Sequence, residues 1–292
     1  MIQVLKNYIV SRGNWMTSNL LTQESSIPAT PTITYAGASG FPSNDLRFTS
    51  SAYSSGTAFA AMERRISEVY NPTTSNYIAG EPYIYEIDGA TQSGELAPFN
   101  STYLFSALSA RPGQVYRARV RHKDSAGRWS HWSAPAEFLV SAPDVTQYVD
   151  ALRITELHYH PSDATAAEQS MGWDDDDFEF IELQNIGPVA IDLTNVRFTK
   201  GADFDFPENT LINPGDYLLV VKNQAAFEFR YGAGLPVAGE WDPTQKLSNG
   251  GENVKLSLGS GTAIIEFTYD DAAPWPTSPD GAGFSLTLNC PD

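Results

Sequence analysis

The sequence predicts an all-β protein built from two β-sandwich domains, with one short helix at the N-terminus. Short apolar or alternating runs recur between clusters of Gly, Pro, Asn and Ser from about residue 28 onward, which is the pattern of strands and turns. The chain has 292 residues, enough for about two domains. Residues 1–145 hold 11 basic and 11 acidic groups, whereas residues 146–292 hold 7 and 24 and so carry the whole net charge of −17. Two surfaces this different indicate two domains.

The first segment, residues 1–24, reads as the helical end of a preceding domain. Apolar residues recur near helical spacing at Ile2, Leu5, Ile9 and Val10, which predicts a helix over about residues 2–22. A linker rich in Ser, Pro and Thr follows, in which no helix can continue. The segment has neither the apolar core nor the cleavage site of a signal peptide, and no run approaches the ~20 apolar residues of a membrane span.

The composition also restricts the chemistry. The single cysteine, Cys290, allows no internal disulfide, and a thiol so close to a terminus is a poor nucleophile because nothing need bury or activate it. The acidic second half repels nucleic acid and anionic membranes and suits divalent cations. Nucleophile elbows, phosphate-binding glycine loops and Cys-His arrangements are absent from the sequence.

Residues 28–142 predict the first β-sandwich, and its last third carries the clearest signature, "YRARVRHKDSAGRWSHWS". Alternation along a strand puts its three arginines on one face. The stretch resembles the fibronectin type III family, and "WSHWS" resembles the Trp-Ser-x-Trp-Ser box of cytokine-receptor-like members. The resemblance implies a structural cation–π ladder of Arg117, Arg119, Arg121, Trp129 and Trp132. A receptor surface is the alternative function, and we expect His122 and His131 to be surface or packing residues.

Residues 148–292 predict the second sandwich. The motifs "ITELHYHPSD", "DDDDFEFIELQN", "NPGDYLLVVKN", "LSNGGENVKLSL" and "FTYDDAAPWPTSPDGAGFSL" follow in order. In this order they resemble a bacterial lamin tail domain, which implies an immunoglobulin-like fold and no agreed catalytic residues. Such domains commonly occur in large secreted or surface proteins, often downstream of a CotH-type kinase-like domain. The N-terminal stretch "YIVSRGNWMTSNLL" is similar to the end of a CotH-type kinase-like domain.

The resemblance to these multidomain proteins gives expectations for origin and location. The chain is expected to be the C-terminal part of a larger extracellular or cell-surface protein, with Met1 an internal start, which would account for the missing signal peptide. Its expected partners are domains of the parent protein, or a surface polysaccharide or protein. Nucleic-acid binding and membrane insertion are not expected.

Four consecutive aspartates precede a strand in "GWDDDDFEFIEL", residues 172–183. Alternation puts Glu179 on one face of that strand and Glu182 on the other, among apolar neighbours on both sides, and few basic partners exist in this half of the chain. We therefore predict a cation site, with calcium as the ion because it takes six to eight oxygen ligands. A solvated loop is the alternative reading of the run. The candidate ligands are Asp174, Asp175, Asp176, Asp177, Glu182, Asp270, Asp271 and Asp280.

A second cation chemistry is suggested by "ITELHYH". Alternation predicts that Ile154, Glu156, His158 and His160 share one strand face, so that two imidazoles and a carboxylate could hold zinc with an open position for water. With Asp177 as base, such a site would hydrolyse phosphate or carboxylate esters. The alternative is that the imidazoles are exposed at the strand end, because Pro161 closes the strand at once.

Two smaller predictions complete the analysis. "NQAAFEFRYG" predicts a short helix closed by Gly232. Trp173, Trp241 and Trp275 suggest either a carbohydrate-stacking platform or core residues. The leading functional hypothesis is a non-catalytic binding or structural module with a cation site in its acidic domain. The competing hypothesis is the metal-dependent ester hydrolase.

Overall fold

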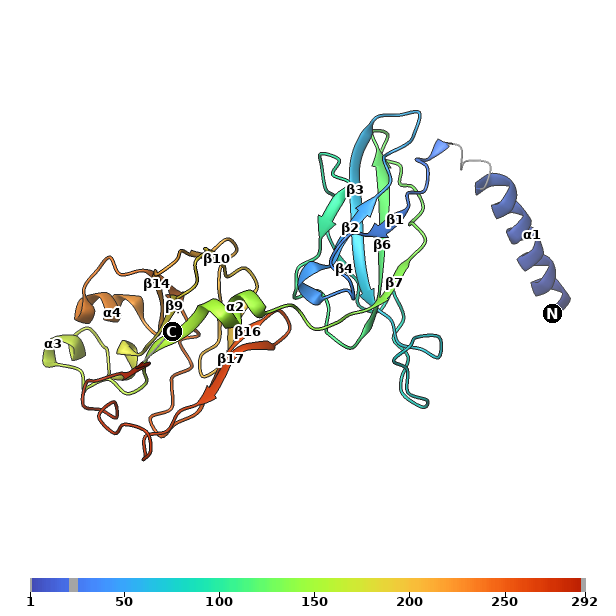
Figure 1. Ribbon diagram of the computed structural model, residues 1–292. Coiled ribbons are helices and arrows are strands. Elements are labelled where there is room, and N and C mark those ends of the chain that lie inside the picture. Colours follow the sequence, from blue (N-terminus) through green and yellow to red (C-terminus); the bar gives the residue numbers. More distant parts are fainter. Residues whose placement is uncertain (1, 21–25, 290–292) are drawn as a thin grey trace. The chain divides into compact units, whose positions relative to one another are not determined.

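The computed structural model describes residues 2–20 and 26–289 and confirms the all-β class (Figure 1). Cys290 and residues 21–24 of the predicted N-terminal segment lie outside the described residues. The chain divides into two compact units. The first unit comprises Met1–Phe105 with Ser109–Ser141, and the second comprises Ser106–Leu108 with Ala142–Asp292.

Helix α1 (Ile2–Leu20) confirms the helix predicted from the apolar spacing. Its described side chains from residue 3 to residue 16 are all exposed, including Leu5 and Ile9 at 60% and 59% of their full area. The helix therefore presents apolar side chains that no described part of the chain covers.

The first unit contains two sheets. One has the order β1 (Ile33–Tyr35), β2 (Arg47–Ser50), β5 (Thr102–Leu104). The other has the order β4 (Thr91–Gln92), β3 (Phe59–Glu68), β6 (Val115–Asp124), β7 (Ala136–Leu139), and a short 3-10 turn, η2, spans Ser43–Asp45. Side chains from both sheets, among them Phe48, Ile66, Ala118 and Phe138, form one apolar core. Because burial alternates along β6, its arginines lie on the face away from this core.

The second unit also packs two larger sheets over one core. The five-stranded sheet has the order β15 (Val237–Glu240), β14 (Tyr217–Val221), β9 (Phe180–Asn185), β8 (Leu152–His158), β18 (Leu286–Thr287). The four-stranded sheet has the order β12 (Phe204–Asp205), β11 (Val196–Lys200), β16 (Asn253–Leu258), β17 (Thr262–Thr268). A small ribbon pairs β10 (Ile191–Asp192) with β13 (Leu211–Ile212), and short helices are α2 (Thr146–Ala151), α3 (Ala166–Gln169), η3 (Asp176–Phe178) and α4 (Gln224–Tyr231).

Helix α4 covers part of the outer face of the five-stranded sheet. Asn223 caps its first turn by accepting a hydrogen bond from the Ala226 backbone N–H, and Gly232 at φ +98° ends it, as the sequence predicts. Phe227 of this helix packs in a buried cluster with Phe180 of β9. The outer face of the sheet therefore has apolar walls next to polar strand positions.

A bulge in β8 corrects the predicted alternation. Ile154 pairs with Leu183 and Glu156 pairs with Glu182, so Thr155 is the extra residue between them. Directly paired residues share a face, and Leu183 and Glu182 are neighbours on opposite faces. Ile154 therefore packs against the core, whereas Glu156 lies on the outer face. The prediction that Ile154 shares a face with Glu156 is wrong, because strict alternation cannot include an inserted residue.

Candidate functional site

A stack of cations and indole rings lies on the outer face of the first unit. The Arg121 guanidinium lies over both Trp129 and Trp132, at 4.3 and 4.5 Å from the ring centroids. Arg65 of β3 lies over Trp132 at 4.5 Å, and the Lys123 ammonium lies over Trp129 at 5.3 Å. Three of the five predicted ladder residues thus stack together, and two basic side chains from β3 and β6 extend the stack.

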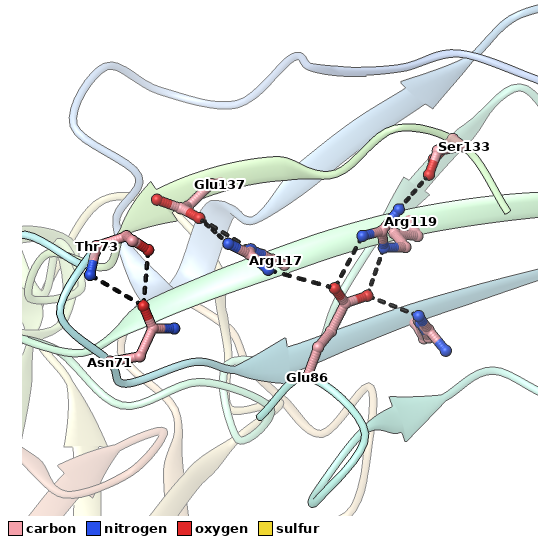
Figure 2. A network of polar contacts seen from close by, with 8 residues as sticks. Asn71, Thr73, Glu86, Arg117, Arg119, Ser133 and Glu137 are labelled. Atoms are coloured by element: carbon pink, nitrogen blue, oxygen red, sulfur yellow. Dashed lines mark hydrogen bonds and ion pairs between the residues drawn. The ribbon is translucent and has the colours of Figure 1, made fainter. Parts of the chain in front are cut away.

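The other two predicted ladder residues, Arg117 and Arg119, point toward Glu86 (Figure 2). Arg119 donates two hydrogen bonds to this carboxylate, one of them from Nη2 to Oε2 at 2.9 Å, and Arg65 donates to Oε1 at 2.6 Å. Arg117 lies 3.8 Å away and also pairs with Glu137 at 2.8 Å. One carboxylate therefore joins three arginines of two strands to the loop between β3 and β4.

The Glu86 site is electrostatically favourable although the carboxylate is only 11% exposed. Burial alone would raise its pKa, but the hydrogen bonds from Arg119 and Arg65 lower the pKa below its usual value. Sequence reasoning missed Glu86. The available signal was the row of arginines on one strand face, because three close cations require an anion.

His122 is a packing residue of the first unit. It is fully buried, and its ring lies near the rings of Tyr53, Phe59 and Phe99 at centroid distances of 5.6 to 6.3 Å. Burial, followed by the nearby Arg64 charge, lowers its pKa to about 4, so the imidazole is neutral at physiological pH.

In the second unit, the four aspartates have separate roles. Asp174 is exposed, and Asp175 lies 3.6 Å from His160 Nε2. Asp176 pairs with Lys246 at 2.8 Å. Asp177 accepts a hydrogen bond from Asn223, at the start of α4, and another from the Asp174 backbone N–H. The run therefore fixes three neighbouring segments to one another.

The two histidines of "HYH" are held by different partners. His158 is 4% exposed, and its Nδ1 lies 3.1 Å from the Tyr231 hydroxyl of α4. Burial, with smaller contributions from Arg230 and His160, lowers the pKa of His158 to about 4. His160 lies between two carboxylates instead, with Nδ1 2.5 Å from Asp280 and Nε2 facing Asp175.

Three glutamates lie on or next to the strand pair β8–β9: Glu156 in β8, Glu182 in β9, and Glu179 directly before β9. Glu179 is fully buried; its Oε2 accepts a hydrogen bond from the Leu247 backbone N–H, and burial raises its pKa to about 9. Glu182 and Glu156 face each other on the outer face. They accept hydrogen bonds from the hydroxyls of Thr155 and Ser285, respectively. The predicted separation of Glu179 from Glu182 is confirmed.

The predicted cation ligands are thus distributed over several places. Asp175 and Asp280 meet at His160, and Glu182 meets Glu156. Asp270 accepts a hydrogen bond from the Ala272 backbone N–H, at a turn. Within residues 2–20 and 26–289, no group of three or more His, Cys, Asp and Glu side chains is arranged to hold a metal ion. Calcium and zinc remain predictions that metal analysis would test.

The predicted tryptophan platform is not assembled as one surface. Trp241 is 2% exposed and belongs to the core of the second unit. Trp173 packs against Phe178 and Phe229, and Trp275 packs on the core from a half-buried position. The core reading therefore holds for Trp241, since a fully covered ring cannot stack on a ligand.

The fold of the second unit defines a class of protein module, the immunoglobulin-like β-sandwich. The family model described as Lamin Tail Domain matches residues 146–271, which span nearly all strands of this unit. No curated protein matches the chain. Among the described helices, none combines the length and the apolar character needed to cross a membrane. Over residues 146–271, the second unit is therefore similar to a lamin tail domain.

Proposed function

We propose that the chain is a non-catalytic binding and structural part of a larger bacterial protein, located outside the cell or on its surface. The lamin tail-type unit is the binding module, and the fibronectin type III-like unit is a stiff spacer. The observation that carries this proposal is the lamin tail match over residues 146–271, because the resemblance brings no catalytic residues with it.

The arrangement of the histidines supports the same proposal. A hydrolytic zinc site needs its imidazoles directed at one ion. His158 instead contacts Tyr231 in a buried position, and His160 contacts Asp280 and Asp175. Each imidazole ties β8 or its end to another segment, which is a structural role.

The exposed helix α1 supports a connection to another domain. Its apolar side chains, such as Leu5, Tyr8 and Ile9, are more than half exposed in the described chain. A parent domain that covers them would remove this apolar area from water, at about 25 cal/mol per Å².

The test combines chemistry and binding on one preparation. Metal content is measured by elemental analysis, and phosphoesters and carboxylic esters are offered before and after chelation. Binding is measured on surface polysaccharides and on the recombinant upstream domain of the parent protein. We expect retention on one of these surfaces without ester turnover. Stoichiometric zinc, with turnover that chelation and His158→Ala both abolish, would overturn the proposal in favour of a hydrolase.

A further inference from the structure

A pocket of about 560 Å³ opens on the outer face of the five-stranded sheet of the second unit. This volume lies within the range of roughly 300–1,000 Å³ that is typical of ligand sites. Strands β8, β9 and β14 form its floor, and helix α4 and the segment before β15 form its walls. Four aromatic side chains line it: Phe180, Tyr217, Phe227 and Tyr231.

The charged groups of this pocket are all acidic. Glu156 and Glu182 lie directly opposite each other on paired strands, and Asp216 lies at the rim. Their only side-chain partners in the described chain are neutral: Ser285, Thr155 and Asn213, respectively. Among the residues that the structure describes, no lysine or arginine lines this pocket.

This arrangement is unfavourable without a ligand. Like charges directly opposite on neighbouring strands destabilise a sheet. Burial raises the pKa of Glu182 despite the opposing hydrogen bond from Thr155, and the nearby Glu156 charge raises this pKa further. His158, which is 4% exposed, packs against two of the wall residues, Phe180 and Tyr231, and among the described residues its Nε2 has no hydrogen-bond partner. A cationic ligand would relieve the repulsion between the two carboxylates.

We propose that this pocket binds an arginine side chain presented by a partner polypeptide. A guanidinium group has five donors in one plane, so it can serve two carboxylates, and its flat face stacks on aromatic rings. The aliphatic stem of arginine suits the apolar walls. The inference rests on the proposed binding role and adds to it a site and a partner chemistry.

The choice of arginine follows from charge complementarity and from the shape of the walls. A metal ion would require more ligands than the carboxylate pair offers, and it would leave the aromatic rings unused. A lysine ammonium is a compact, strongly hydrated charge that gains less from flat aromatic surfaces. The lysine alternative is included in the test.

The test is an NMR titration of the whole chain with three blocked amino acids: N-acetyl-arginine methylamide, its lysine counterpart, and the neutral isostere with citrulline. We expect the arginine compound to shift the amide signals of Gly215, Leu219 and Tyr231 saturably, with millimolar affinity. The citrulline compound should give no saturable shift. Glu182→Gln and Glu156→Gln should each weaken arginine binding about tenfold or more, because each removes a charge-assisted contact. Glu208→Gln, at an exposed glutamate outside the pocket, is the matched control and should bind like the wild type.

Several outcomes would overturn the inference. They are the absence of saturable shifts, equal shifts with citrulline, equal affinity for the lysine compound, or unchanged affinity in both pocket variants. The citrulline comparison uses only the wild-type protein, so it does not depend on the folding of a variant. If the chain still binds its polysaccharide or parent domain while arginine does not bind, only this inference fails.

Discussion

Replacing Glu86 by alanine should strongly destabilise the first unit. The change removes the carboxylate that contacts Arg65, Arg117 and Arg119 and leaves three cations close together. Removing one partner of a buried ion pair costs about 3–5 kcal/mol. Arg119 keeps the Ser133 carbonyl and Arg117 keeps Glu137, so we expect a value near the lower end, about 3 kcal/mol.

Native-state hydrogen exchange measures this cost within the first unit alone. The most slowly exchanging amides of β3 and β6 report the free energy of opening that unit. A loss of about 3 kcal/mol lowers their protection by about two orders of magnitude. The matched control is Glu137→Ala, which removes a carboxylate that is 39% exposed and pairs with Arg117 as its one basic partner among the described residues. Its cost should stay at about 0–1 kcal/mol.

The comparison between the two variants shows whether the arginine cluster depends on Glu86. If Glu86→Ala lowers the protection of β3 and β6 no more than Glu137→Ala does, Glu86 is not the anion on which the arginine cluster depends. The loop between β3 and β4 would then be held by other contacts.

Three further predictions concern single features. Burial raises the pKa of Glu179 to about 9 in the folded protein, above its value in the unfolded chain. The contribution of Glu179 to the free energy of unfolding is therefore fully present below the unfolded pKa and is lost as the pH rises toward 9. Relative to the wild type, the free energy of unfolding of Glu179→Gln should therefore rise between pH 5 and pH 8, by up to ~1.4 kcal/mol per pH unit in urea unfolding. The same dependence of the free energy of unfolding on pH in both proteins would contradict this. Gly251→Ala should cost about 2 kcal/mol or more in urea unfolding, because φ is +93° and the added Cβ would lie 2.4 Å from a carbonyl oxygen. Gly250→Ala, with open space around its Cβ, should cost less than ~1 kcal/mol, and similar costs would refute the reasoning. A double-mutant cycle on Arg121 and Trp129 should give a coupling of about 0.5–2 kcal/mol, and no coupling would mean that the stack is incidental.

Local patterns in the sequence were sufficient to predict several elements. Helical spacing predicts α1, and the stretch "NQAAFEFRYG" with its closing Gly232 predicts α4. Alternation predicts that Glu179 and Glu182 lie on opposite faces, which holds because β9 has no inserted residue. These features depend on residues that are neighbours in the chain.

Features that depend on partners far along the chain were not predictable. Glu86 belongs to a loop, and nothing near it in sequence indicates that it meets Arg119 of β6. The aspartate run reads as one cluster, yet Asp176 meets Lys246 and Asp175 meets His160. Such pairings follow from the tertiary fold, which places distant segments side by side.

The extra residue Thr155 makes β8 tolerant of a length change of one. Thr155 has no partner of its own in the β8–β9 register, so deleting it would leave Ile154 opposite Leu183 and Glu156 opposite Glu182 as consecutive residues of a regular ladder. Glu156 would still face outward, and Leu157 would still pack in the core. The direct loss would be the hydrogen bond from the Thr155 hydroxyl to Glu182. A deletion of three nucleotides at this codon would thus keep both the acidic pocket and the core, so we expect homologous domains that retain the pocket to occur with and without this residue.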